Sequence, residues 1–214
     1  MDEEITIIDA NTRSQKIKNF LADNKKKLIS ISLALILILI SFYSYQIYKE
    51  GHKKRLANEY NSAIIEYENG DKSKIISSMK NIIKDKDSTY SPLGLYFLID
   101  NDLLKNKDEV NDLFNILIDK TNLELEIKNL IIYKKGLYNS NFVSENELIN
   151  ILKPIINSES IWKSHVLYLI AEYFYSKNEK KKAKEFFNEI ILLENSNKNL
   201  IKEAKKRINR DFSD

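Results

Sequence analysis

The sequence predicts an all-α protein in which a single transmembrane helix is followed by a solenoid of paired helices. Three observations lead to this prediction. Residues 28–48 form a run without a charged residue, and the rest of the chain repeats apolar residues at spacings of three and four. Glycine and proline are rare, with four and two residues in a chain of 214. Since both residues interrupt helices, their scarcity favours long helices.

The uncharged run from Leu28 to Tyr48 is the predicted transmembrane helix. Its 21 residues would extend over roughly 31 Å at about 1.5 Å per residue, the thickness of a bilayer's hydrocarbon core. The aromatic residues Phe42, Tyr43 and Tyr45 suit the membrane–water interface. No small-residue cleavage pattern follows the run, which we therefore interpret as a retained anchor rather than a cleaved signal peptide or a buried core helix.

The basic residues on either side of this run predict its orientation. Six lie on the N-terminal side and four on the C-terminal side, counted within about 20 residues of the run. Lys25, Lys26 and Lys27 adjoin the run directly. Because positively charged flanks stay in the cytoplasm, we expect residues 1–27 to be a cytoplasmic tail and the C-terminal domain to lie outside the cytoplasm.

The tail is predicted to have two parts. Its first 15 residues are expected to be mostly disordered. From Gln15 to Lys27, the residues Ile17, Phe20 and Leu21 lie at helical spacings, which predicts a short basic amphipathic helix. This flank either serves only to set the topology or lies on the inner leaflet with its lysines toward anionic headgroups.

Residues 53–214 are predicted to form a helical domain. The expected helices cover residues 54–69, 72–85, about 92–103, 107–119, 122–138, 144–157, 160–177, 180–194 and 198–211. Gly70 is expected to stop the first of them, and Pro92 fits the first turn of the third. Ser144 and Glu147 have the spacing of a capping box.

The helices of this domain are predicted to pair into repeats. The clearest unit is residues 167–190, in which Ala171 and Ala183 take the small positions of a tetratricopeptide repeat. A small residue on each helix lets the two helices cross closely. Corresponding positions recur at 63, 98, 132 and 171. We therefore predict about four helix pairs, with residues 198–211 as a capping helix.

The sequence offers little for catalysis or for nucleic-acid binding. His52 and His165 are far apart, there is no cysteine, and the four glycines are scattered, which excludes a glycine-rich phosphate loop. The net charge is only +3 with acidic and basic residues intermixed, which gives no basic stripe for nucleic acid. We predict no enzymatic activity, no cofactor and no metal. Trp162 is expected to be a packing residue.

The candidate functional residues lie on the first helix of the predicted pairs, which lines the concave face of such a solenoid. They are tyrosines and polar residues between the core positions: Tyr60, Tyr67, Glu126, Asn129, Tyr133, His165, Tyr168, Glu172 and Tyr175. Tyrosine combines a large contact area with a polar tip, which suits a peptide or a partner loop. The alternative is that these side chains only cover neighbouring helices.

The layout of the chain resembles a known family. Phe20-Leu21-Ala22-Asp23-Asn24-Lys25 leads into one apolar run and a helical domain, as in the bacterial YfgM-like proteins, the ancillary subunits of the SecYEG translocon. The stretch SPLGLYFL at residues 91–98 lies where that family has a tyrosine-led, alanine-rich helix, here with leucine and phenylalanine in place of most alanines. The resemblance implies a non-enzymatic inner-membrane protein with a periplasmic domain, located beside the translocon and periplasmic folding factors.

We therefore predict a scaffold, held in the lipid bilayer by residues 28–48, that binds protein partners. The expected partners are translocon subunits and a membrane-anchored periplasmic chaperone. One alternative is a receptor or adaptor whose helical domain faces the cytosol, and the orientation of the membrane helix distinguishes it. Another is a membrane-tethered enzyme or regulator of envelope assembly, which would need a catalytic constellation.

Overall fold

The structure, a computed structural model, describes residue 13 and residues 15–212. Every regular element within those residues is a helix, which confirms the all-α prediction. Disorder is the sequence prediction for the first 15 residues. Of these, residues 1–12 and 14 lie outside the described residues. The chain divides into two compact units, Met1–Arg55 and Leu56–Asp214.

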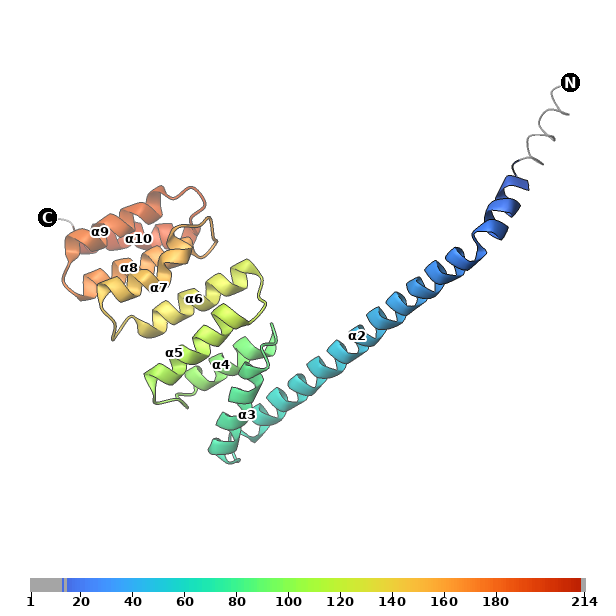
Figure 1. Ribbon diagram of the computed structural model, residues 1–214. Helices are drawn as coiled ribbons and strands as arrows, with labels where there is room; N and C mark the ends of the chain where they lie inside the picture. Colours follow the sequence, from blue (N-terminus) through green and yellow to red (C-terminus); the bar gives the residue numbers. More distant parts are fainter. Residues whose placement is uncertain (1–12, 14, 213–214) are drawn as a thin grey trace, which may run out of the picture. The chain divides into compact units, whose positions relative to one another are not determined.

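The first unit contains the predicted transmembrane helix. Residues 15–23 are helical, a turn follows at Asn24, and helix α2 runs from Lys25 to Glu66 (Figure 1). The most apolar window of α2 is long and apolar enough to cross a membrane, and none of it is buried in the protein. A core helix of the same composition would be mostly buried, so the exposure of α2 favours an anchor in lipid.

The second unit contains the end of α2 and the remaining helices. Their bounds are α3 Lys72–Lys84, α4 Tyr90–Asp100, α5 Lys107–Asn115 with a π-helical turn at Ile116–Lys120, α6 Leu125–Asn139, α7 Glu145–Ile156, α8 Lys163–Ser176, α9 Lys180–Leu192 and α10 Lys198–Asp211. The helices predicted separately at residues 28–48 and 54–69 are one continuous helix, α2. The other bounds agree with the ranges expected from apolar spacing to within a few residues at most ends.

Local signals begin several helices as expected. The Glu147 backbone N–H donates to Ser144 Oγ at 3.4 Å, and the Ser144 backbone N–H donates to Glu147 Oε2 at 2.9 Å, which completes the capping box of α7. Pro92 lies in the first turn of α4. At the other end of a helix, α2 stops at Glu66, somewhat before the expected stop at Gly70.

Helix α4 is shorter than predicted, because Asp102 and Leu103 lie beyond its end at Asp100. Asp102 adopts a φ of 50°, and the Leu103 backbone N–H donates to the Leu98 carbonyl at 2.9 Å. This is the hydrogen bond of a Schellman motif, in which a left-handed residue ends the helix. Apolar spacing alone could not find this end, because Leu103 continues the pattern.

Two apolar clusters form the core of the second unit, and α6 takes part in both. The first cluster joins α2 through α6 and includes Met79 and Phe114, whereas the second joins α6 through α10 and includes Phe187. The neighbouring residues Ile131 and Ile132 on α6 belong to different clusters. Consecutive residues of a helix point about 100° apart. Helix α6 therefore contributes one buried side chain to each cluster and lies between them.

Adjacent helices pack in a repeat-like manner, although the closest pairs differ in part from those predicted. Helices α6 and α7 pair, and α8 and α9 pair most closely, with Ala171 and Ala183 fully buried. In the first half, α3 packs closely on α4, whereas the sequence predicted α2 with α3 and α4 with α5. The Ser91 hydroxyl joins this pair by donating to the Ile82 carbonyl at 2.8 Å.

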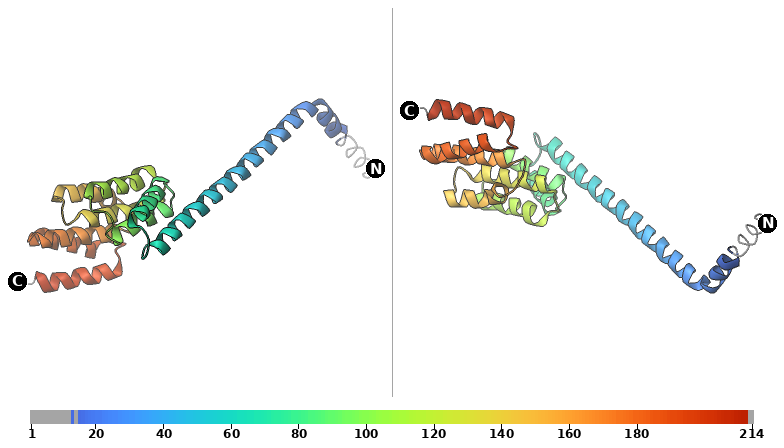
Figure 2. Two further views of the ribbon diagram at one scale, coloured as in Figure 1. Left: turned by 90° about the horizontal axis from the view of Figure 1, so that it is seen from below. Right: turned by 90° about the horizontal axis from the view of Figure 1, so that it is seen from above.

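Helix α10 closes the C-terminal end of the domain. It lies against α9 and α8 (Figure 2). Ala204 is its only fully buried residue among those described, while Leu200, Ile201 and Ile208 are partly buried against the second cluster. The helix therefore covers the last apolar face of the stack, the role expected of residues 198–211.

Candidate protein-binding surface

A pocket opens where α4, α5 and α6 meet. Its volume is about 260 Å³, and it is lined by Tyr96, Ile99, Asp100, Phe114, Tyr133, Lys134, Leu137 and Tyr138. Helices α4 and α6 are the first helices of two predicted pairs. The pocket therefore lies on the kind of surface that the sequence assigned to partner binding, although only Tyr133 among its residues was predicted.

The pocket is lined by aromatic side chains and by two charged residues. Lys134 Nζ lies 3.8 Å from the centroid of the Tyr96 ring, a cation–π distance. Burial raises the pKa of Tyr96 to about 12, and the negative charge of Asp100 contributes. Tyr96 is therefore a neutral phenol at physiological pH, so Lys134 and Asp100 provide the charges near its ring.

This arrangement suits a protein partner more than a reaction. Leu137 is 49% exposed, so the apolar surface of the pocket reaches the outside. Aromatic side chains next to an exposed leucine can receive an apolar side chain of a partner, and Lys134 can meet a carboxylate beside it. Sequence reasoning missed Tyr96, which appeared only within the stretch used for the family resemblance.

Tyr133 joins the pocket to an aromatic cluster between α6 and α8. Its ring stacks on Trp162, with centroids 5.9 Å apart and planes at 17°. His165 packs against both rings, at 5.9 Å from Tyr133 and 5.1 Å from Trp162. The Trp162 indole N–H donates to the Glu126 carbonyl at 3.1 Å. Trp162 is thus a packing residue, as the sequence indicated.

Glu126 and Asn129 belong to the same corner. The Ser160 hydroxyl donates to Glu126 Oε2 at 2.8 Å, and Asn129 Nδ2 lies 3.5 Å from Glu126 Oε1. Asn129 is buried. Burial lowers the pKa of His165, which a contact with the Ile161 backbone partly opposes. The structure therefore brings four predicted residues together, mainly as a joint between helices.

Two predicted residues near the start of the domain pack against α4 and its first turn. The Tyr60 ring lies 6.0 Å from that of Tyr90, and the Tyr67 ring meets Phe97 edge to face at 5.2 Å. Lys72 Nζ lies 5.7 Å from the Tyr67 ring. Both tyrosines are partly buried, and neither lines the pocket. A role of these residues in binding stays a prediction.

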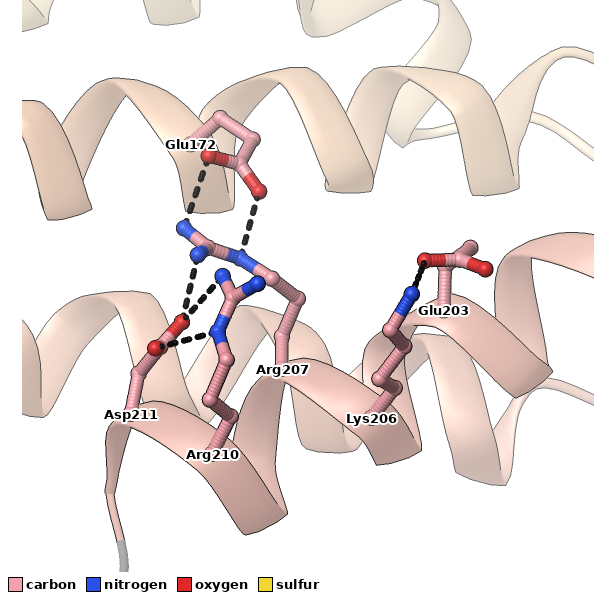
Figure 3. A network of polar contacts seen from close by, with 6 residues as sticks. All are labelled: Glu172, Glu203, Lys206, Arg207, Arg210 and Asp211. Carbon is pink, nitrogen blue, oxygen red and sulfur yellow. Dashed lines mark hydrogen bonds and ion pairs between the residues drawn. The ribbon is translucent and has the colours of Figure 1, made fainter.

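The predicted residues of α8 lie beneath or beside α10. Arg207 of α10 places Nε 2.8 Å from Glu172 Oε1 and donates from Nη2 to Glu172 Oε2 at 2.9 Å (Figure 3). Its guanidinium carbon lies 4.2 Å from the Tyr175 ring centroid. The Tyr168 ring packs on Phe187 at 5.5 Å. A role of these residues in binding stays a prediction.

Titratable side chains are not gathered into a metal site in the described part of the chain. Among residue 13 and residues 15–212, no group of three or more His, Cys, Asp or Glu side chains could hold a metal ion. The notable features of this surface are therefore its aromatic pocket and its helix-joining contacts.

Comparison with known proteins supports the family resemblance. The chain is similar to the ancillary SecYEG translocon subunit of Buchnera aphidicola subsp. Acyrthosiphon pisum (strain APS), at 25% identity over 179 residues. The match covers 81% of this chain and 89% of that protein. It is far longer than the apolar run, so it includes much of the helical domain. No family model matches the chain, and no solved structure matches it.

Proposed function

We propose that this protein is a membrane-tethered, non-catalytic scaffold that binds protein partners beside the Sec translocon, with its helical domain on the periplasmic side of the inner membrane. The observation that carries the proposal is the similarity to an ancillary SecYEG translocon subunit over 81% of the chain. The exposed apolar window of α2 and the name of that relative both indicate membrane anchoring.

The proposed mechanism is binding assisted by tethering. Because the protein and a membrane-bound partner are both confined to the bilayer, the effective concentration of each near the other is raised. A weak contact at the domain surface then suffices for stable association. We assign that contact to the pocket between α4 and α6, where Tyr96, Tyr133 and Leu137 can receive an apolar side chain. The partners are translocon subunits and a membrane-anchored periplasmic chaperone.

The side of the membrane is tested by cysteine labelling. The chain has no cysteine, so Asn195→Cys in the helical domain and Asn19→Cys before the apolar run each create a unique thiol at an exposed residue. Intact spheroplasts are treated with a membrane-impermeant maleimide. We expect Asn195→Cys to react at once and Asn19→Cys only after permeabilisation. The reverse pattern would place the helical domain in the cytosol and contradict the periplasmic assignment.

The partner contact is tested by photo-crosslinking in cells. A photoreactive amino acid replaces Leu137 in the pocket, and in a control it replaces Leu192, which is 83% exposed at the end of α9. We expect adducts with translocon subunits from position 137 but not from 192. Tyr96→Ala with Lys134→Ala should reduce them. Equal adducts from both positions would exclude the pocket, and failure to copurify with SecYEG would contradict the scaffold proposal.

A further inference from the structure

We propose that residues 15–27 form an interfacial segment that lies in the headgroup region of the bilayer, with an apolar face in the acyl boundary and lysines on anionic phosphate headgroups. The proposal rests on the membrane anchoring stated above. It adds a second lipid contact, next to the transmembrane helix, whose ligand is the surface of an anionic bilayer.

The apolar face is formed by Ile17, Phe20 and Leu21. Residues 15–23 are helical, and spacings of three and four place these three side chains on one side of the helix, within an arc of about 100°. They are 60%, 60% and 50% exposed. Large apolar side chains grouped on one face of a short polar helix are the pattern of a helix that lies in a membrane interface.

The charges of the segment complement an anionic membrane. Lys16 and Lys18 flank the apolar face, and the run Lys25–Lys27 opens α2. Asp23 is the only acidic residue among residues 15–27. The lysines of residues 16–27 are all exposed. Basic residues this close to a lipid surface are attracted to anionic headgroups, at about fivefold in binding per lysine.

A turn at Asn24 allows the segment to leave the direction of α2. The Asn24 backbone N–H and side-chain amide both donate to the Phe20 carbonyl at 3.0 Å. The side chain thus competes with the helical hydrogen-bond ladder, as asparagine commonly does at helix ends. In Figure 2, the blue N-terminal helical segment runs in a different direction from the long helix that follows it. One part of the chain can therefore lie along the surface while α2 crosses the bilayer.

The position of the segment favours lipid over a soluble protein as its occupant. Leu28, the first residue of the apolar run, lies seven residues after Leu21. Seven helical residues extend over about 10 Å, so Leu21 stays within reach of the headgroup layer whenever the run is inserted. The alternative is a flank that only sets the topology, in which case its apolar side chains would remain in water.

Spin labels on the full chain in lipid nanodiscs test the proposal. Single cysteines are placed on the apolar face (Ile17→Cys, Leu21→Cys), on the polar face (Asn19→Cys, Ala22→Cys) and in the middle of the span (Leu39→Cys). Collisions with oxygen report lipid, and collisions with a water-soluble nickel chelate report water. In nanodiscs that contain phosphatidylglycerol, we expect the spin labels at positions 17, 21 and 39 (labels 17, 21 and 39) to collide more often with oxygen. The spin labels at positions 19 and 22 (labels 19 and 22) should collide more often with the nickel chelate.

The charge contribution is tested in the same system. Lys16→Gln with Lys18→Gln should lower the ratio of lipid-bound to free segment by about 25-fold, and label 39 should not change. In phosphatidylcholine alone, labels 17 and 21 should shift toward water in the unsubstituted background. Equal behaviour of labels 17 and 21 in both lipids would contradict the anionic headgroup contact.

The outcomes separate this inference from the anchoring on which it rests. If label 39 collides mainly with the nickel chelate, α2 is not a membrane anchor and both proposals are wrong. If label 39 lies in lipid while labels 17 and 21 behave like 19 and 22, the anchor stands and the interfacial segment is refuted. Protection of labels 17 and 21 from both reagents would show a protein on this face and would also refute it.

Discussion

Arg207 and Glu172 join the capping helix α10 to α8 through two nitrogen–oxygen contacts of 2.8 and 2.9 Å. The same guanidinium lies over the Tyr175 ring and also pairs with Asp211. The Arg207 side chain is only 11% exposed. The apolar residues of α10 pack on the second cluster, and this polar contact adds a specific attachment to α8.

Arg207→Gln should therefore loosen α10. Removal of the guanidinium breaks the contacts of Arg207 with Glu172, Asp211 and the Tyr175 ring, a loss of about 1–3 kcal/mol, although Arg210 still pairs with Asp211. Hydrogen exchange of the α10 amides in the full chain should accelerate accordingly. Lys206→Gln is the matched control, because Lys206 pairs with Glu203 on the same helix but is 64% exposed (Figure 3). Equal exchange in the two variants would contradict this role of Arg207.

The stability of the C-terminal end of α10 should also depend on pH. A hydrogen bond from Arg210, supported by the charge of Arg207, lowers the pKa of Asp211 below its ordinary value of 3.8, although burial opposes this. A carboxylate whose pKa is lower in the folded state than in the unfolded state stabilises the folded state at pH values above the ordinary pKa. This stabilisation is lost as the pH falls through the lowered pKa. A carbon-13 NMR titration of the Asp211 carboxylate should show the shift, and Arg210→Gln should reduce it. An ordinary pKa in the unsubstituted chain would rule the effect out.

A reciprocal amide pair links α5 to α6 and should be sensitive to single substitutions. Asn111 Nδ2 donates to Asn139 Oδ1 at 3.0 Å, and Asn139 Nδ2 donates back to Asn111 Oδ1 at 2.8 Å. Asn139 is 2% exposed. Asn111→Ala should lower the free energy of unfolding by about 1–3 kcal/mol, because it leaves Asn139 Oδ1 without its donor, although Asn139 Nδ2 keeps its hydrogen bond to the Lys135 carbonyl. Chemical unfolding followed by circular dichroism measures this loss.

The double substitution provides the control for this pair. Asn111→Leu with Asn139→Leu removes both polar groups, so it should cost less than the sum of the single substitutions to leucine. Additive losses would show that the two amides do not depend on each other.

Gly136 is predicted to be intolerant of a side chain. A Cβ at this position would lie 2.9 Å from Leu152 Cγ, with Leu152 Cδ2 closer still, and Leu152 is fully buried. Gly136→Ala should therefore destabilise the domain by about 1–3 kcal/mol through overpacking, despite the usual gain of about 1 kcal/mol for alanine over glycine in a helix. Gly51→Ala, with no atom within 4 Å of its Cβ, should leave the melting temperature of the domain unchanged. Stabilisation by Gly136→Ala would mean that α6 and α7 pack more loosely.

The family resemblance and the pocket illustrate how far sequence reasoning reached toward function. The order of a basic flank, an apolar run and a helical domain pointed to the ancillary translocon subunits, and the comparison with the Buchnera protein supports that resemblance. Tyr133, which the sequence proposed for partner binding, lines the pocket, whereas sequence reasoning did not connect Tyr96 with it. These residues are 37 positions apart, and no local pattern indicates that both line one pocket.

The sequence by itself determined the features that depend on neighbouring residues: the apolar run, the helix ranges and the capping box of Ser144 and Glu147. Each results from side-chain spacing or from hydrogen bonds within one turn. Only the tertiary structure decided that α3 packs closely on α4, that α10 reaches Glu172 and Tyr175, and that Tyr96 meets Tyr133 in one pocket. Those outcomes depend on how side chains that are distant in the sequence pack together. Apolar periodicity predicts which face of a helix is buried, but it does not predict which other helix covers that face.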